Sequence, residues 1–366
     1  MRNSIAKNLL ACAFTAALTC TTTQAKNLFF EQVNLASDQP GVAQIQDPNL
    51  VNAWGMSFSA GGPFWVNANG TGLSLLYSVA TDSNGVPTVT KQGLEVSIPG
   101  DGTPSGQVFD NNGSINGDVF IFASEDGTIS GWRNSLGDSA EVLTQRDTAV
   151  YKGITLVMTA SHGPVLLAAN FAEGTVDEYD TNMTLITQFI DTKAKAGFAP
   201  FNVEVIDGGV FVTFAMQDSE KHDDVPGKGN GIIDLLNPDT GKFTRLVTGK
   251  GAGGKEKDLN SPWGLALSPS SWGSISDKLL VGNFGDGTIT VFNANGKNKG
   301  QLKSDDGGLI VIDGLWGLTF GNDGSAGVSD QLYFSAGPNG ESHGLFGVLV
   351  PGPKDNKHHP DDDDND

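Results

Sequence analysis

Two histidine-bearing segments of this 366-residue chain could carry chemistry. One reads QDSEKHDDVPGKGNG, contains His222-Asp223-Asp224 and spans 217–231; the other reads GPNGESHG, contains His343 and spans 337–344. Both replace a short turn that needs neither a histidine nor so long an insertion. Imidazole and carboxylate groups together can hold a divalent cation or act as general acids and bases. We therefore expect His222 and His343 to face one site, with Asp218 nearby.

Further polar residues follow short apolar runs at comparable places along the chain. Together with the residues above, they make up the candidate ligand-binding set Asn67, Glu125, Asn170, Asp218, His222, Asp223, Asn283 and His343. Asp218, His222 and His343 are the candidate metal ligands, with calcium as an example of the ion. The alternative is structural, because Asp and Asn side chains also cap turns with hydrogen bonds and need no ligand to do so.

Established catalytic signatures are missing from the sequence. There is no Gly-x-Ser-x-Gly elbow, and both cysteines, Cys12 and Cys20, lie near the N-terminus. The glycines occur in hairpins and not before a helix, so they do not form a phosphate-binding loop. No catalytic residue can be assigned from these patterns.

The elements that must position these residues repeat along the chain. Trp-Gly followed by an apolar run begins at Trp54, Trp263 and Trp316, and less regular copies bring the total to six. A period near 50 residues with about four short strands in each copy indicates radial β-repeats. Apolar residues at helical spacing do not occur after the N-terminal segment.

These repeats predict an all-β, six-bladed β-propeller. The last copy is short, and NLFFEQVNL (27–35) is a strand without a partner near the N-terminus. We expect this strand to complete the last blade, since closing the ring protects the sheet edges. Asp-Gly and Glu-Gly pairs should form tight hairpins with positive φ, and the repeat tryptophans should pack in the interior.

Composition and the two ends of the chain suggest an exported protein. Residues 1–25 have the basic start, short apolar stretch and small-residue end of a signal peptide. Lipidation at Cys20 is the alternative processing route. Residues 26–353 would then form one propeller domain in the periplasm or outside the cell, and the acidic residues 354–366 a disordered tail. Without the signal, no segment is apolar enough to anchor in a membrane.

The formal net charge of −20 limits the partners of the protein. Phosphates repel such a surface, so nucleic acid is excluded as a partner. Divalent cations and cationic ligands are compatible, and the partner could be a polymer, a protein or a small molecule. We expect a monomer.

Several segments together resemble a known family. They are DPNLVNAWGMSFS, FASEDGTISGW, AMQDSEKHDDVPGKGNG, LNSPWGLALSP, VGNFGDGTI, VIDGLWGLTFG and GPNGESHGLFG. The chain resembles an uncharacterised family of bacterial exported proteins, related to NHL-repeat and strictosidine-synthase/gluconolactonase-like propellers. The resemblance implies six blades and supplies no catalytic residues.

Two functions fit these features. The favoured one is a binding or scaffold module with an unknown ligand. The alternative is a metal-dependent hydrolase or lactonase-like enzyme at the mouth of the channel. Its ion would lie among Asn170, Asp218, His222, Asn283 and His343, so convergence of these groups on one point would favour the enzyme.

Overall fold

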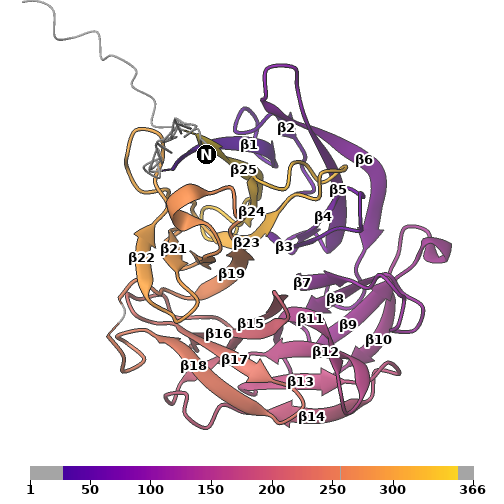
Figure 1. Cartoon of the computed structure of the whole chain (residues 1–366). Helices are drawn as coiled ribbons and strands as arrows, with labels where there is room; N and C mark the ends of the chain where they lie inside the picture. Colours follow the sequence, from indigo (N-terminus) through magenta and orange to yellow (C-terminus); the bar gives the residue numbers. More distant parts are fainter. Residues whose placement is uncertain (1–27, 256, 353–366) are drawn as a thin grey trace, which may run out of the picture.

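A computed structural model describes residues 28–255 and 257–352. The expected signal peptide and acidic tail lie outside the described residues. Six antiparallel sheets are arranged radially around a central channel (Figure 1). The predicted six-bladed β-propeller is therefore confirmed. Among the described residues, no helix has the length and apolar character needed to cross a membrane.

Each blade is built from consecutive strands, with the innermost strand first. Blade 1 contains β3 (Ala53–Ser57), β4 (Phe64–Ala68), β5 (Leu73–Thr81) and β6 (Pro87–Ser97). Blade 2 contains β7 (Pro104–Phe109), β8 (Phe120–Ser124), β9 (Thr128–Trp132) and β10 (Glu141–Gln145). Blade 3 contains β11 (Tyr151–Thr159), β12 (Gly163–Asn170), β13 (Thr175–Tyr179) and β14 (Leu185–Phe189).

The second half of the ring has the same order. Blade 4 contains β15 (Phe198–Ile206), β16 (Gly209–Met216), β17 (Ile232–Asn237) and β18 (Lys242–Thr248). Blade 5 contains β19 (Pro262–Leu267), β20 (Leu279–Asn283), β21 (Ile289–Phe292) and β22 (Asn298–Gln301). Blade 6 contains β23 (Leu315–Phe320), β24 (Leu332–Ala336) and β25 (Leu345–Gly352). Two short 3-10 turns, η1 (Asn134–Leu136) and η2 (Gly273–Ile275), lie between strands.

The N-terminal strand closes the ring. β1 (Phe29–Ser37) pairs antiparallel with β25 and so becomes the fourth strand of blade 6. Leu35 and Ala36 on β1 are fully buried. This confirms the predicted closure. The short strand β2 (Ile45–Gln46) pairs parallel with the outer edge of β1, an addition that the repeat pattern did not predict.

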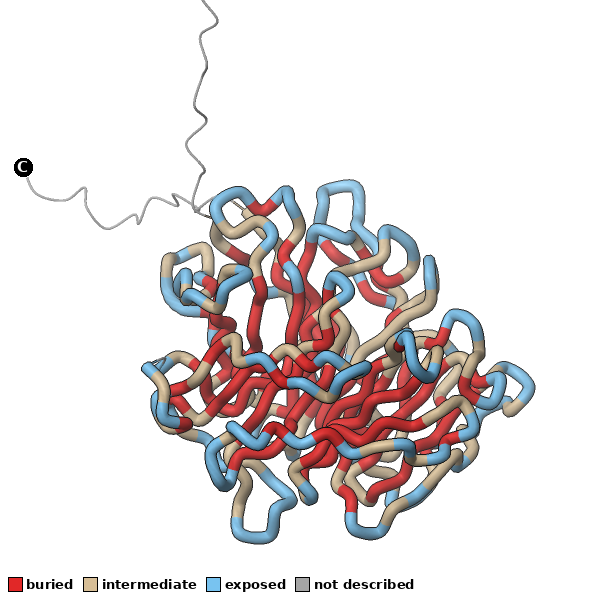
Figure 2. Tube along the Cα trace, turned by 60° about the horizontal axis from the view of Figure 1, so that its bottom comes forward, coloured by how far each residue is buried: buried red, intermediate tan, exposed pale blue. Residues whose placement is uncertain are grey.

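Both faces of the central strands are buried. Every residue of β4, β8, β9, β13, β20 and β24 is buried. Figure 2 shows buried strands in the interior and exposed loops around them. Each blade is covered on both faces by its neighbours, so apolar residues lie on both faces of its central strands, and polar residues there, such as Asp177 and Glu178, are buried as well.

Glycines allow the innermost strands to approach one another closely. A Cβ on Gly264 of blade 5 would clash with the Trp316 carbonyl oxygen of blade 6, and one on Gly55 would clash with the Ser105 carbonyl oxygen. Blade 4 has Asn202 at the corresponding position. Its side-chain amide donates a hydrogen bond of 2.9 Å to the Trp263 carbonyl oxygen, so a polar contact replaces the close packing there.

Tight turns join the second and third strands of most blades. Gly127, Gly174 and Gly287 have φ angles of 78°, 72° and 70°, which confirms the predicted hairpins. The two expected exceptions are also present. The segment containing His222 joins β16 to β17, and the segment containing His343 joins β24 to β25. All these connections open on one end of the channel, which we call the mouth.

Candidate functional site

One residue from each innermost strand lies at the same level of the channel. Each directly precedes the glycine, or Asn202, that packs on the next blade. These six residues are Trp54, Ser105, Lys152, Phe201, Trp263 and Trp316. The strands therefore place four aromatic side chains, one hydroxyl and one ammonium around the channel axis.

Aromatic side chains fill the channel at this level. The aromatic layer, as we call it, consists of Trp54, Phe171, Phe201, Trp263, Phe284 and Trp316. The Trp54 and Trp316 rings stack with centroids 3.7 Å apart. Trp54 of blade 1 also contacts Trp263 of blade 5 at 6.2 Å, and Phe201 of blade 4 contacts Trp316 of blade 6 at 5.7 Å. Because these blades are not neighbours, the contacts cross the channel and separate its two ends.

Lys152 stands where other blades have an aromatic residue. Its side chain is only 2% exposed, and its ammonium forms ion pairs with Glu125 and, at 3.3 Å, with Asp223. The ammonium also lies 5.3 Å from the Trp54 ring centroid and 6.0 Å from that of Phe171. It is thus held between carboxylates on the mouth side and aromatic faces on the channel side.

Electrostatics keep this lysine charged. Burial by itself would lower the pKa of the Lys152 ammonium, but the neighbouring carboxylates of Glu125 and Asp223 raise it above its ordinary value. Partial burial likewise opposes ionisation of Asp223. Lys152 and the hydrogen bond with His222 outweigh that effect and lower the pKa of the Asp223 carboxyl.

An amide and carboxylate network continues around the mouth. The Asn52 side-chain amide donates to Glu341 at 2.7 Å and to the Asn69 side-chain oxygen at 3.2 Å. Asn69 in turn donates to Glu125 at 2.9 Å. The Trp316 indole N–H donates to the Asn52 side-chain oxygen at 3.0 Å, which ties this network to the aromatic layer.

Glu341 has an unusual protonation equilibrium. Burial raises the pKa of its carboxyl to about 7, and the nearby Glu125 carboxylate adds to the rise, while Lys152 opposes it. At neutral pH this residue therefore exists in both protonation states. The residue also has a φ of 64°, a conformation that a glutamate rarely adopts.

The loop between β16 and β17 is fixed to the rim by its own polar groups. The Gln217 side-chain amide donates to the Phe171 carbonyl oxygen at 2.5 Å. The Asp218 carboxylate accepts the His222 backbone N–H at 3.0 Å, so it acts as a loop cap. Burial raises the pKa of the Asp224 carboxyl to about 6, although the Ser261 hydroxyl opposes this. These contacts hold His222 and Asp223 over the channel mouth.

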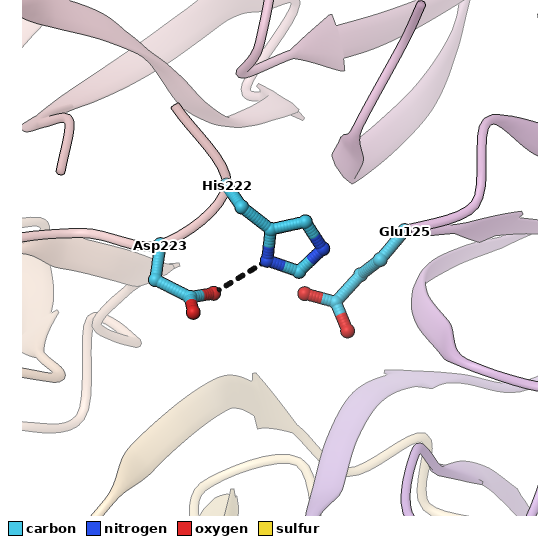
Figure 3. A group of neighbouring side chains, drawn as sticks. All are labelled: Glu125, His222 and Asp223. Carbon is cyan, nitrogen blue, oxygen red and sulfur yellow. Dashed lines mark hydrogen bonds and ion pairs between the residues drawn. The ribbon is translucent and has the colours of Figure 1, made fainter. Parts of the chain in front are cut away.

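Three side chains could offer ligands to one ion. Ligand atoms of Glu125, His222 and Asp223 lie within 4.8 Å of one another. The His222 ring lies between the two carboxylates, and its Nδ1 is 2.9 Å from Asp223 (Figure 3). The His222 and Asp223 side chains are 46% and 68% exposed. However, Lys152 already supplies a positive charge to both carboxylates, so a divalent ion there would have to overcome its repulsion.

The structure gives His343 a different partner. Its Nδ1 lies 2.7 Å from Asp38, which follows β1, and Asp38 also accepts the Gly344 backbone N–H at 2.9 Å. These contacts join the β24–β25 loop to the closing strand. His343 is therefore not in the group of Glu125, His222 and Asp223, whereas Glu341 from the same loop faces that group.

The three expected asparagines are fully buried in or beside their hairpins. Asn67 donates to the Ser105 carbonyl oxygen at 3.0 Å. Asn170 donates to Asp177 at 3.1 Å, and Asn283 donates to the Thr290 hydroxyl at 3.1 Å. The side-chain amide N–H groups of all three are thus used by the fold, as the structural alternative expects, whereas the Asn67 side-chain oxygen accepts no hydrogen bond from the described residues. None of the three belongs to the group that could bind an ion.

The sequence interpretation missed Lys152 and Asn52. A signal for Lys152 does exist, because Tyr151-Lys152-Gly153 occupies the same repeat position as Ala53-Trp54-Gly55. The lysine takes the place of a tryptophan and so must lie on the channel axis. Asn52 directly precedes the first strand of its blade and has a φ of 48°, but an asparagine in the sequence does not by itself predict either feature.

Comparisons with known proteins support the architecture. No family model matches the chain. An uncharacterised protein of Acanthamoeba polyphaga mimivirus is 29% identical over 340 residues, covering 86% of this chain and 84% of that protein. A second one from the same virus is 27% identical over 306 residues, covering 78% and 72%. These relatives are viral, whereas the sequence motifs suggested a bacterial family.

Solved structures with a similar fold share little sequence identity with this chain. A streptogramin B lyase has a TM-score of 0.53 and 13% identity, covering 89% of this chain and 98% of that chain. An auxiliary nutrient binding protein from Bacteroides ovatus has a TM-score of 0.50 and 12% identity, covering 89% and 77%. At this identity the likeness concerns the fold alone. The chain is thus similar to β-propeller proteins over nearly all of its described length.

Proposed function

We propose that the protein is a binding module whose channel mouth holds a positively charged group of its ligand. The observation that carries this proposal is an excess of carboxyl groups around one buried ammonium. Lys152 pairs with Glu125 and Asp223, while Asp224 and Glu341 form no ion pair within the described residues. A cation arriving at the mouth would relieve the repulsion among these carboxyls.

The surroundings support binding over catalysis. The strands fix the aromatic layer beneath the carboxyls, so the site is rigid before a ligand arrives. The overall charge of −20 would also steer cations towards the protein. Kinship with NHL-like propellers, as the sequence motifs suggest, fits a binding role. The similar solved structures include a lyase and a nutrient-binding protein, so the shared fold by itself is compatible with either function.

A binding titration tests the proposal. We expect a fluorescently labelled tri-lysine peptide to bind, and a tri-glutamine peptide of the same length not to bind, in a fluorescence anisotropy experiment. Asp223→Asn should weaken tri-lysine binding about fivefold, the factor for one exposed ion pair of ~1 kcal/mol. Because Asp223 is 68% exposed, the variant should keep its fold, which circular dichroism can verify.

Asp207→Asn is the matched control. Asp207 is exposed in the turn between β15 and β16, at the opposite end of the channel. The Asp207→Asn substitution removes the same charge from the protein as Asp223→Asn does, but at a position away from the mouth. If both variants weaken tri-lysine binding equally, the attraction comes from net charge and the mouth is not the site. Binding of the wild-type protein to neither peptide would also contradict the proposal.

A second candidate is the metal-dependent hydrolase. The geometry that favours it is the convergence of Glu125, His222 and Asp223, with Asp223 orienting the imidazole through Nδ1. The other ring nitrogen, Nε2, would then be available to an ion or a water molecule. Elemental analysis of the purified protein, with thermal melts before and after a chelator, distinguishes the two functions. Bound metal at one equivalent that is lost in His222→Ala would favour the hydrolase.

A further inference from the structure

The opposite end of the channel contains a second chamber, which we call the lower chamber. It is a cavity of about 410 Å³. Most of its lining residues lie on the innermost strands, on the C-terminal side of the residues at the level of the aromatic layer. Trp263 forms part of its boundary with the aromatic layer. Since contacts between non-neighbouring blades close the channel at this level, the lower chamber is separate from the mouth. Its size falls within the range of small-molecule sites.

One titratable side chain lines this chamber. Glu204 on β15 is the sole acidic or basic residue among the described residues of the lining. No hydrogen bond or ion pair to its carboxyl is found within the described part of the chain. Burial raises the pKa of the Glu204 carboxyl to about 8. Glu204 is partly exposed, so its carboxyl is accessible from the chamber. An ionisable group with a raised pKa in a concave site is typical of a ligand-binding position.

The remaining lining is apolar or uncharged. Met56, Phe58, Phe109 and Leu318 supply apolar surface from three different blades. Uncharged polar groups also line the chamber, from Ser57, Gln107, Thr155, Asn202 and Thr319. A ligand of this chamber would therefore need one group that pairs with a carboxylate and a small organic body that can contact both apolar side chains and uncharged polar groups.

We propose that the lower chamber is a binding site for a small organic monocation, an amine on an alkyl or aryl body, with Glu204 as its counter-ion. An ammonium group would pair with the Glu204 carboxylate, which has no charged partner among the described residues of the lining. A neutral ligand of the same shape would leave the carboxyl without a charged partner. This site is distinct from the mouth and does not depend on the function proposed there.

Matched probes separate the charge from the shape. We expect 2-phenylethylamine to bind the intact protein by calorimetry, and its isostere 2-phenylethanol to bind at least tenfold more weakly. Glu204→Gln should reduce amine binding by at least about tenfold and leave alcohol binding unchanged, because it removes only the charge. Asp223→Asn, which changes the mouth at an exposed residue, should leave amine binding unchanged.

Proton release provides a second readout. An amine with a pKa near 10 stays charged between pH 6 and 8, while Glu204 must lose its proton to pair with it. Amine affinity should therefore rise about tenfold between pH 6 and 7 and level off above pH 8. The heat of binding should depend on the ionisation enthalpy of the buffer, in wild type and not in Glu204→Gln.

Four results would overturn this assignment. The first is equal binding of the amine and the alcohol, and the second is unchanged amine binding in Glu204→Gln. The third is the absence of amine binding at millimolar concentration in the wild-type protein. Loss of amine binding in Asp223→Asn alone would place the amine at the mouth and would equally contradict the lower chamber as its site.

Discussion

Lys152 shows how one substitution in a repeat changes the chemistry of the channel. Three other blades place a tryptophan at the corresponding position, and the backbone around it is the same. The lysine brings a charge onto an axis where four of the other five positions are aromatic and the fifth is Ser105. Glu125 and Asp223 compensate that charge, so the mouth depends on residues from three different blades.

Removing this charge should destabilise the protein strongly. Lys152→Met keeps most of the side-chain volume but leaves Glu125 without its buried partner. We expect the free energy of unfolding at pH 7 to fall by about 3–5 kcal/mol in urea titrations. Combining Lys152→Met with Glu125→Gln should recover part of that loss. A single variant as stable as wild type would show that the pair is not coupled.

Glu341 should make stability depend on pH. The folded protein keeps a proton on this carboxyl up to about pH 7, whereas an unfolded chain loses it near its ordinary pKa of 4.5. The wild-type protein therefore loses stability as pH rises through that range. Glu341→Gln lacks this term, so its stability relative to wild type should improve by about 2–3 kcal/mol between pH 4.5 and 8. A difference that stays constant with pH would contradict the shifted pKa.

At the scale of the elements, the innermost strands depend on glycine. Their close approach leaves no room for a Cβ at Gly264, which has an ordinary φ and is constrained by space alone. This constraint is a property of the ring, because the atom that would clash belongs to the next blade. Asn202 shows that a larger residue fits only where it forms a specific hydrogen bond to the neighbouring strand.

Gly264→Ala should therefore destabilise the protein much more than the substitution of an exposed glycine. Gly93 on β6 is exposed and has nothing within 4 Å of an added Cβ. We expect Gly264→Ala to lower the free energy of unfolding by about 1–3 kcal/mol, and Gly93→Ala to change it by less than about 0.5 kcal/mol. Thermal or urea unfolding of both variants measures this. Equal effects would argue against close packing of the innermost strands.

The elements could be predicted from the sequence far better than the site. The repeat period, the hairpin glycines and the strand without a partner can all be recognised in the sequence. Six blades and the closure by β1 could therefore be predicted. The partner of His343 could not be predicted, because Asp38 is 305 residues away and comes close only when the ring closes. Likewise, Asn170 looked like a ligand, but its amide serves the hairpin that surrounds it.

For the whole molecule, the aromatic layer divides one channel into two sites. The mouth has several carboxyls around Lys152, whereas the lower chamber has the single carboxyl of Glu204. We therefore expect the two proposed sites to bind different ligands without competing. Export depends on residues 1–25, which lie outside the described residues, and it stays a prediction.

Export can be measured directly. If residues 1–25 are a signal peptide, the mature protein begins at Lys26 and contains no cysteine. We expect intact-mass spectrometry of protein from the native compartment to give that mass, and thiol reagents to leave it unmodified. A mass that retains Met1, or one that includes lipid on Cys20, would contradict this prediction.

A structure determined with the tri-lysine peptide tests the central claim most directly. We expect an ammonium group within about 3 Å of the carboxylate of Asp223 or Glu341, above an unchanged aromatic layer. Lys152 should remain paired with Glu125. An occupied mouth with a metal ion bound by Glu125, His222 and Asp223, or a peptide bound elsewhere on the protein, would contradict it.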